Sequence, residues 1–505
     1  MWAAFYYLSD CPVGGEKGHK MKTDRHLICR ICVTVLATVC CVLILTAGAS
    51  CSLDRGKELY KQGKIDEAIV EVQKEVDSNP KSAIARRWLG FLLLKKYRYG
   101  EALPQLLECR ALKADGADIR NNLGMSYLGL GQYDKAEEEL KEAIRMKPKY
   151  PEALYNLGNT YMKLNEVDNA IESFRKAALY APKDNMVHNN LGLALQEKGK
   201  LDEAIPEHKR ATELAPNNAE MWMNLGVAQK KKGNRAEAVA ALEKTLALDP
   251  NNYTAHLGLA EAMATEGKND DALAHYQAAS KIKPTEFSPL FNIGVICSKK
   301  GEFAKATDPF KAALAISPDD SEALAYLGWA QFKTGNTAEA KANLEKATEK
   351  NPNQLSAWLN LASIYTAEKN TDAAINAWES VSRLDPTNSA ALINLGNLYL
   401  EKDERDKAAE NYHAAVKADP RAAAAYFGLG SVYSKMGNTD EAIVQFRKAI
   451  ELSPRMSAAY NNLGVELEKK GKVEDAKAQY RKALEIDINN EDARKNLQRL
   501  KVKPG

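Results

Sequence analysis

The body of the chain repeats one pattern of apolar, small and polar positions every 34 residues. Ten prolines mark this period: Pro148, Pro182, Pro216, Pro250, Pro284, Pro318, Pro352, Pro386, Pro420 and Pro454. Thirteen alanines, from Ala68 to Ala476, keep the same register without an insertion. A period of this length indicates a stack of similar small units, each of which buries its apolar face against its neighbours.

Residues 151–184 show which elements the pattern predicts within one unit. When the unit is numbered from 1 to 34, positions 4, 7, 8 and 11 are apolar or small and share one face of a helix. Most units carry glycine near position 15, where a left-handed residue ends a helix. The proline at position 32 is rejected by a helix interior. Each unit is therefore predicted to contain helix A, a tight turn, helix B and a proline-marked loop.

This pattern closely resembles the tetratricopeptide repeat. The residues that carry the resemblance in one repeat are Leu154, Leu157, Gly158, Tyr161, Ala170, Phe174, Ala177 and Pro182. The resemblance covers residues 49–490 as thirteen repeats, which begin at residues 49, 83, 117, 151, 185, 219, 253, 287, 321, 355, 389, 423 and 457. It implies an all-α fold, a right-handed superhelical α-solenoid of about thirteen 34-residue helix-turn-helix units. Residues 491–505 are expected to form a capping helix and a tail, because an open solenoid end must be covered.

A binding face can be assigned from the same register. If positions 4, 7, 8 and 11 face helix B, positions 2, 5, 6, 9, 12 and 13 face the opposite way. In the family this face lines a concave groove, and asparagine ladders line the similar groove of the O-linked N-acetylglucosamine transferase repeats. The expected contacts to a protein or peptide partner are Asn122, Asn156, Asn190, Asn224, Phe291, Asn292, Trp329, Asn360 and Asn394.

Two interpretations of these residues stay open. A carboxamide donates and accepts hydrogen bonds, so a row of asparagines suits the backbone of an extended peptide. Alternatively, the asparagines bond only to neighbouring groups of the solenoid. The aromatic residues at positions 5 and 9 either mark a binding site or pack sideways between successive A helices.

Residues 1–50 have a different pattern, which predicts a signal peptide or a membrane anchor. Ile31 to Ala49 are 19 uncharged residues that follow a short basic segment, and Met21 is an alternative start. Three fates are compatible with the residues: cleavage before Cys51 with lipid attachment, cleavage after Ala49, or retention as a single anchor. Each fate places the repeats outside the cytoplasm, and the lipobox-like residues before Cys51 suggest a bacterial envelope.

Composition and motifs narrow the functional classes. The chain is 45% apolar with a formal net charge of +3, so it lacks the clustered basic charge that nucleic acids require. The histidines show no metal spacing, and no phosphate loop or nucleophile motif is evident. We therefore expect a scaffold that binds an extended peptide or a partner helix in its concave groove. It is expected not to be an enzyme, to need no cofactor or metal, and to be held at a membrane by the leader or a Cys51 lipid. The alternatives are an assembly factor for a polysaccharide export or pilus complex, and a non-catalytic glycosyltransferase subunit.

Overall fold

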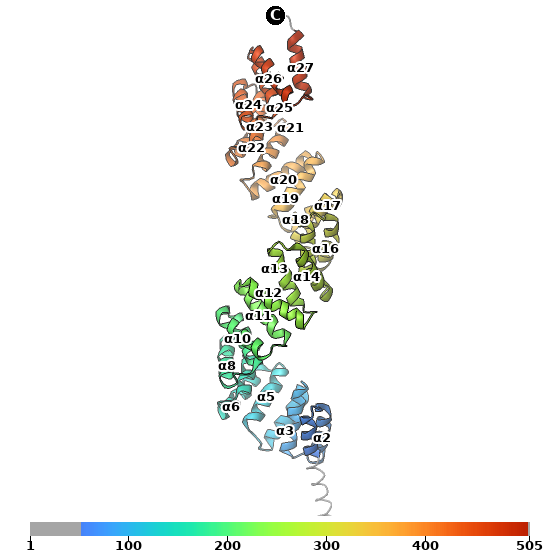
Figure 1. Cartoon of the computed structure of the whole chain (residues 1–505), viewed down its shortest axis with the longest axis vertical. Coiled ribbons are helices and arrows are strands. Elements are labelled where there is room, and N and C mark those ends of the chain that lie inside the picture. Colours follow the sequence, from blue (N-terminus) through green and yellow to red (C-terminus); the bar gives the residue numbers. More distant parts are fainter. Residues whose placement is uncertain (1–51, 503–505) are drawn as a thin grey trace, which may run out of the picture. The chain divides into compact units, whose positions relative to one another are not determined.

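The structure is a computed structural model that describes residues 52–502, and every regular element in that range is a helix (Figure 1). Residues 52–61 are helical. The helices that follow are α2 (Ile65–Ser78), α3 (Ala83–Lys95), α4 (Tyr99–Ala111), α5 (Ala117–Gly129), α6 (Tyr133–Met146), α7 (Pro151–Lys163), α8 (Val167–Tyr180), α9 (Asn185–Glu197), α10 (Leu201–Leu214), α11 (Ala219–Lys232), α12 (Arg235–Leu248), α13 (Tyr253–Thr265), α14 (Asn269–Ile282), α15 (Phe287–Lys299), α16 (Phe303–Ile316), α17 (Ser321–Lys333), α18 (Thr337–Lys350), α19 (Leu355–Ala367), α20 (Thr371–Leu384), α21 (Ser389–Glu401), α22 (Arg405–Ala418), α23 (Ala423–Met436), α24 (Thr439–Leu452), α25 (Ser457–Lys469), α26 (Val473–Ile486) and α27 (Glu491–Val502).

The helices form two compact parts, which meet in sequence at Asp249 and Pro250 and are described separately. In both parts, the odd-numbered helices from α3 to α25 are A helices and the even-numbered helices are B helices. Each A helix packs on the B helix of its own repeat, and successive A helices also contact each other, as α3 contacts α5 and α15 contacts α17. The A helices of a part therefore make one layer. The predicted all-α repeat solenoid is confirmed.

A left-handed residue at position 15 ends helix A in all thirteen repeats. Glycine takes this conformation in nine of them, at Gly63, Gly131, Gly199, Gly233, Gly267, Gly301, Gly335, Gly437 and Gly471. The other four repeats use Tyr97, Asn165, Lys369 and Asp403, with φ between 57° and 61°. A side chain with a Cβ is strained in this region, so the surrounding helices must hold these four residues in place.

Close approach between helices A and B explains the small residues of the pattern. In the repeat that begins at residue 151, Ala170 and Phe174 of α8 are fully buried against α7. A Cβ placed on Gly158 of α7 would lie 2.5 Å from Cε1 of Phe174. Glycine at position 8 therefore lets the ring at position 24 lie directly against helix A in this repeat.

Side chains at position 4 join successive repeats. The indole Nε1 of Trp222 donates to the carbonyl oxygen of Pro216 at 2.9 Å, and Trp358 makes the same bond to Pro352 at 2.9 Å. Arg86 donates through Nε to the carbonyl oxygen of Pro80 at 2.7 Å. The position-32 carbonyl would otherwise lack a partner after a helix end, and the position-4 side chain supplies one.

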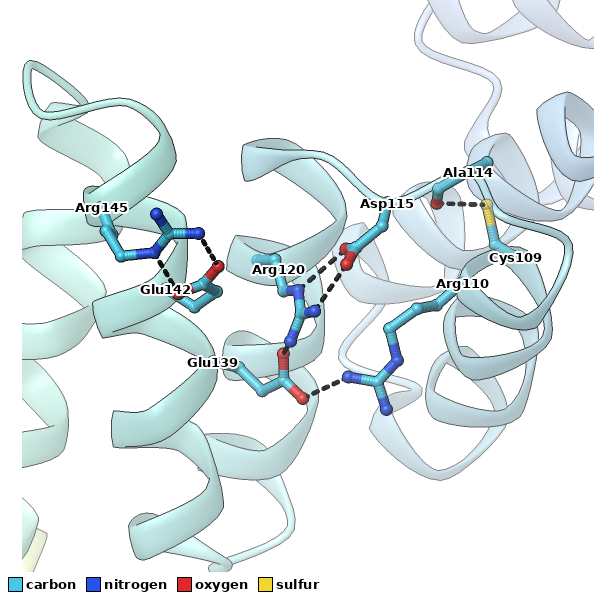
Figure 2. Close-up of polar contacts among 8 residues, drawn as sticks. All are labelled: Cys109, Arg110, Ala114, Asp115, Arg120, Glu139, Glu142 and Arg145. Carbon is cyan, nitrogen blue, oxygen red and sulfur yellow. Dashed lines mark hydrogen bonds and ion pairs between the residues drawn. The ribbon is translucent and has the colours of Figure 1, made fainter.

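Ion pairs reinforce the junction at which Ala114 replaces the proline (Figure 2). Arg120 donates to both carboxylate oxygens of Asp115, at 2.8 and 2.5 Å, and to Glu139 at 2.8 Å. Arg110 donates to the other oxygen of Glu139 at 2.6 Å. These hydrogen bonds, first that with Asp115, raise the pKa of Arg120. Glu139 is buried, so two guanidinium groups neutralise a carboxylate that would be costly to leave alone.

The last helix, α27, covers the end of the final repeat. Ala493, Leu497 and Leu500 of α27 are buried against α25 and α26. Arg499 makes a two-pronged ion pair with Glu468, with nitrogen–oxygen distances of 2.6 and 2.7 Å. The remaining face of α27 is mostly charged, as expected for a helix that ends a solenoid in water.

Candidate peptide-binding groove

A groove of about 780 Å³ lies on the A-helix layer of the N-terminal part, over α3, α5, α7 and the start of α9. Most of its lining residues occupy positions 2, 5, 6, 9, 12 and 13 of their repeats, which is the face assigned from the register. Part of the lining, called the apolar wall below, includes Trp88, Phe91 and Met125. The polar lining residues, called the polar wall below, include Asn156 and Tyr155. This combination of an apolar wall and a few oriented polar groups is typical of ligand-binding clefts.

The apolar wall is a packed aromatic cluster. Trp88 and Phe91 of α3 meet edge to face with ring centroids 5.8 Å apart, and Tyr60 contacts both rings, at 6.0 and 5.3 Å. Trp88 and Phe91 are only half buried, so part of each ring faces the groove. Edge-to-face packing fixes the orientation of the rings, so a partner side chain would find a rigid surface.

The polar wall is a hydrogen-bonded row of asparagines. Asn156 of α7 donates to Oδ1 of Asn121 on α5 at 2.9 Å, and Asn121 donates weakly to Oδ1 of Asn122 at 3.4 Å. Asn122 and Asn156 both line the groove. Each of these bonds uses one amide hydrogen and one oxygen lone pair, so an asparagine keeps further capacity to bond a peptide.

The row continues in the next repeats, outside the lining of the groove. Asn224 donates to Asn189 at 2.9 Å, and Asn189 donates to Asn190 at 3.3 Å. Asn190 then donates to the hydroxyl oxygen of Tyr155 at 3.1 Å and to Asn159 at 2.8 Å. Tyr155 lines the groove, so the row from Asn224 reaches the groove through this hydroxyl.

Charged groups flank the groove in both signs. Arg87 Nε lies 2.5 Å from a carboxylate oxygen of Asp118. Lys95 lies over the ring of Phe91 at 5.4 Å, and Lys147 lies over the ring of Tyr150 at 4.3 Å. Burial, followed by the nearby Glu152 charge, raises the pKa of Tyr150 to about 12, so its hydroxyl stays protonated and able to donate.

The remaining predicted contacts, Phe291, Asn292, Trp329, Asn360 and Asn394, lie in the C-terminal part. Phe291 of α15 is half buried in an aromatic stack with Phe287 at 5.4 Å, Tyr326 at 5.7 Å and Phe310 at 5.9 Å. Trp329 of α17 packs edge to face on Phe303 at 4.8 Å. Phe291 therefore contacts the next A helix, α17, through Tyr326, whereas Trp329 contacts the B helix α16, and part of each ring remains accessible.

The three remaining asparagines are half buried on separate A helices of the same part. Asn292 bonds within α15, where its amide donates to the carbonyl oxygen of Ser288 at 2.9 Å. Asn360 lies on α19 and Asn394 lies on α21. They keep the position-6 register, and whether they touch a partner stays a prediction.

The sequence reasoning did not single out Trp88, Phe91 and Tyr150. The register rule would have found the first two, because Trp88 stands at position 6, where most repeats have asparagine, and Phe91 stands at position 9. Tyr150 lies at position 34, in the loop before α7, and the rule for A-helix faces does not reach it. The groove therefore combines an asparagine row with an aromatic wall contributed by a single repeat.

Other features of the sequence bear on chemistry and location. Residues 1–51, which contain the leader and Cys51, lie outside the described residues. Among residues 52–502 no helix has the length and apolarity of a membrane span, and no cluster of three or more metal-binding side chains occurs. Cys109 and Cys297 are buried thiols, and burial raises the pKa of each.

These features define an all-α repeat scaffold with a groove on its A-helix layer. Sequence profiles of the tetratricopeptide repeat match residues 53–117, 326–389, 423–456 and 457–490, and a further TPR repeat profile matches residues 126–165 and 396–437. A profile for the C-terminal domain of cilia and flagella-associated protein 70 matches residues 150–355. The chain is a tetratricopeptide repeat protein. Proteins of this family are protein–protein interaction scaffolds, and the fold is typically non-catalytic.

Comparison with curated proteins finds no match. Among solved structures, similar chains include MamA, with 26% identity over 32% of this chain and 95% of that one and a TM-score of 0.31. YrrB, described as a TPR protein with an unusual peptide-binding site, has 23% identity over 37% of this chain and 97% of that one, with a TM-score of 0.34. PilF of Pseudomonas aeruginosa has 23% identity over 40% of this chain and 92% of that one, with a TM-score of 0.37.

Proposed function

We propose that the chain is a membrane-tethered scaffold that captures an extended segment of a partner protein in the groove over α3, α5 and α7. The observation that carries this proposal is the groove itself, whose lining combines packed aromatic rings with hydrogen-bonded asparagines. An extended peptide presents alternating side chains and backbone amides. The aromatic wall would take the apolar side chains, and Asn122 and Asn156 would bond the backbone.

The energetic anchor in this arrangement is Trp88. A half-buried tryptophan held by two other rings offers a large contact area with little loss of side-chain freedom on binding. Removing such an anchor typically costs 2 kcal/mol or more, which corresponds to a loss of about 30-fold in affinity. Asn122 is expected to contribute less, because its amide exchanges bonds with water for bonds with peptide.

The test uses the full-length protein in detergent and a displayed library of random twelve-residue peptides. Peptides selected on the wild type are measured against Trp88→Ala and Asn122→Ala. The matched control is Leu179→Ala, which removes an exposed apolar side chain of the B helix α8. We expect a loss of about 30-fold for Trp88→Ala, a smaller loss for Asn122→Ala and none for the control. Selected peptides that bind both groove variants as tightly as the wild type would overturn the proposal.

The tether is a separate part of the proposal. We infer attachment to the membrane of a bacterial envelope through the apolar run at 31–49 or a lipid on Cys51, with the repeats outside the cytoplasm. The supporting observation is the order of basic segment, apolar run and small residues. The intact mass of protein purified from its own membranes tests it. A chain that starts at Cys51 with added acyl mass, or an uncut chain, supports the tether, and an unmodified chain that starts at Ser50 contradicts it.

A further inference from the structure

Two histidines face each other in the repeat that begins at residue 253. His256 of α13 and His275 of α14 have their Nδ1 atoms 2.9 Å apart, with ring centroids separated by 5.2 Å and planes inclined by 45°. Both side chains are half buried, so water reaches the pair. The two rings join helix A to helix B within a single repeat.

The equivalent slots of three other repeats hold complementary pairs. These slots are positions 4 and 23. They place Arg86 against Gln105 at 2.6 Å, Arg120 against Glu139 at 2.8 Å and His188 against Glu207 at 2.6 Å. Each of these pairs sets a donor against an acceptor. In the repeat at 253, the same geometry instead brings together two imidazole nitrogens of the same kind.

The proton arrangement of the pair follows from a third contact. Nε2 of His256 lies 3.1 Å from the carbonyl oxygen of Pro250, which can only accept, so this nitrogen carries a hydrogen. Nδ1 of a neutral His256 therefore presents a lone pair towards His275. A hydrogen bond across the 2.9 Å gap requires a proton on Nδ1 of His275. Without that proton, the Nδ1 atoms of His256 and His275 direct their lone pairs into the same gap.

We propose that His256 and His275 bind a divalent transition-metal ion of the zinc class between their Nδ1 atoms. Two nitrogens at about 2.0–2.1 Å from a tetrahedral zinc lie about 3.3 Å apart, so the pair must open by about 0.4 Å and each ring must turn its Nδ1 by about 35° away from the line that joins the two atoms. The bond from His256 to the Pro250 carbonyl is the second-shell contact that orients a metal-binding imidazole. Water completes the coordination, because the described residues contain no cluster with a third protein ligand.

The bound ion acts as a clip between α13 and α14. It replaces one shared proton with two metal–nitrogen bonds and stabilises the folded repeat by mass action. Imidazole ligands suit zinc, copper and nickel, whereas magnesium and calcium prefer oxygen. Both imidazoles bind the ion in their neutral form, and the proton that His275 carries on Nδ1 moves to its Nε2 as the ion takes its place. Protons compete with the ion for the ring nitrogens, so affinity should fall as the pH drops.

The test is a calorimetric titration of the full-length protein with Zn²⁺, with Mg²⁺ as a comparison ion. His275→Gln is the main variant, because glutamine occupies position 23 in three other repeats and its amide can donate to Nδ1 of His256. His256→Asn is the second variant. His413→Asn is the control, because it removes a histidine that contacts Tyr433 elsewhere in the C-terminal part. The cysteines of the leader are present in all four proteins, so their contribution cancels in the comparison.

The expected result is that the wild type and His413→Asn share one Zn²⁺ site that both pair variants lose or weaken by at least tenfold. Mg²⁺ should not bind there. Amide hydrogen exchange should slow in α13 and α14 on Zn²⁺ addition in the wild type and stay unchanged in His275→Gln. Equal Zn²⁺ binding by the wild type and His275→Gln, with equal exchange rates, would overturn the proposal. Circular dichroism without metal confirms that each variant is folded.

Discussion

His208 makes the stability of the N-terminal part depend on pH. This histidine of α10 is fully buried at position 24, the slot that holds Phe174, Phe310 and Phe446 in other repeats. Neither ring nitrogen has a hydrogen-bond partner in the described part of the chain. Burial lowers the pKa of His208 from 6.5 to about 4, so the folded protein keeps the ring neutral at a pH at which the unfolded chain would protonate it.

The direction of the effect follows from proton binding. Between pH 6.5 and about 4 the unfolded chain binds more protons at this residue than the folded chain, so the free energy of unfolding falls as the pH is lowered. The contribution of the neutral His208 ring to the free energy of unfolding is fully present above pH 6.5 and fully lost below about pH 4. At 1.36 kcal/mol per pKa unit, the full loss is about 3 kcal/mol, and most of it is reached by pH 4.5.

The perturbation is His208→Phe, which places in this repeat the residue that its counterparts use. Phenylalanine fits beneath Gly192, as Phe174 fits beneath Gly158. Urea unfolding of wild type and variant at pH 7.5 and pH 4.5 measures the effect. The variant should gain about 1–3 kcal/mol at pH 7.5, because it removes an unpartnered buried polar group. The gain should increase by about 2–3 kcal/mol at pH 4.5.

Carboxylates also titrate in this range, and they do so equally in both proteins. The informative quantity is therefore how much the difference in unfolding free energy between variant and wild type changes from pH 7.5 to pH 4.5. His188 is shared by both proteins as well, and its pKa is raised by its hydrogen bond to Glu207. A difference that is the same at both pH values would show that His208 is protonated, or has a partner, in the folded protein. That result would refute the reasoning. Leu179→Ala, which changes no titratable group, is the control, and its difference from wild type should not change with pH.

Three further substitutions test the packing. Gly158→Ala should lower the free energy of unfolding by about 1–3 kcal/mol in urea denaturation, since its Cβ would meet the ring of Phe174. Lys369→Gly should relieve the strain of the positive φ of 57° and raise the free energy of unfolding by about 0.5–1 kcal/mol, which is measured as a higher melting temperature. An unchanged melting temperature would mean that the turn is not strained. Arg120→Ala should cost about 3 kcal/mol in urea denaturation by leaving the buried Glu139 with one cation, and loss of less than about 0.5 kcal/mol would exclude a structural role for the pair.

Much of the fold could be predicted because the pattern repeats. One repeat with glycine at position 15 establishes a left-handed turn there, and the fixed register carries this expectation to Tyr97 and Asp403, whose own residue types would not suggest it. The register also places Gly158 and Phe174 on helices A and B of one repeat, and the structure shows that the ring lies against the glycine. Local propensity would have failed at these sites, and the stacking of neighbouring repeats decides the conformation.

The sequence predicted the helix face on which the groove lies, but only some of the residues that line it. The register placed Asn122 and Asn156 on the A-helix layer, where the structure finds them. It could not show that Asn156 bonds Asn121 of the preceding repeat, because that pairing depends on how far one repeat rotates against the next. Trp88 was missed because the prediction followed the asparagines at position 6 and passed over the repeats that have another residue there. A repeat that departs from the common residue on a shared surface is a good candidate for a specific binding role.

The asparagine row gives the groove its rigidity. Asn156 and Asn224 each donate to an asparagine of the preceding repeat, so the same side chains that face the binding layer also hold successive A helices together. Each such bond contributes about 1 kcal/mol to stability. A polar wall held in this way does not need to be ordered when a peptide arrives, and less of the interaction energy is lost to side-chain entropy. The consequence is that removal of Asn156 should weaken both stability and binding, whereas removal of Trp88, whose half-buried ring lines the groove, should mainly weaken binding.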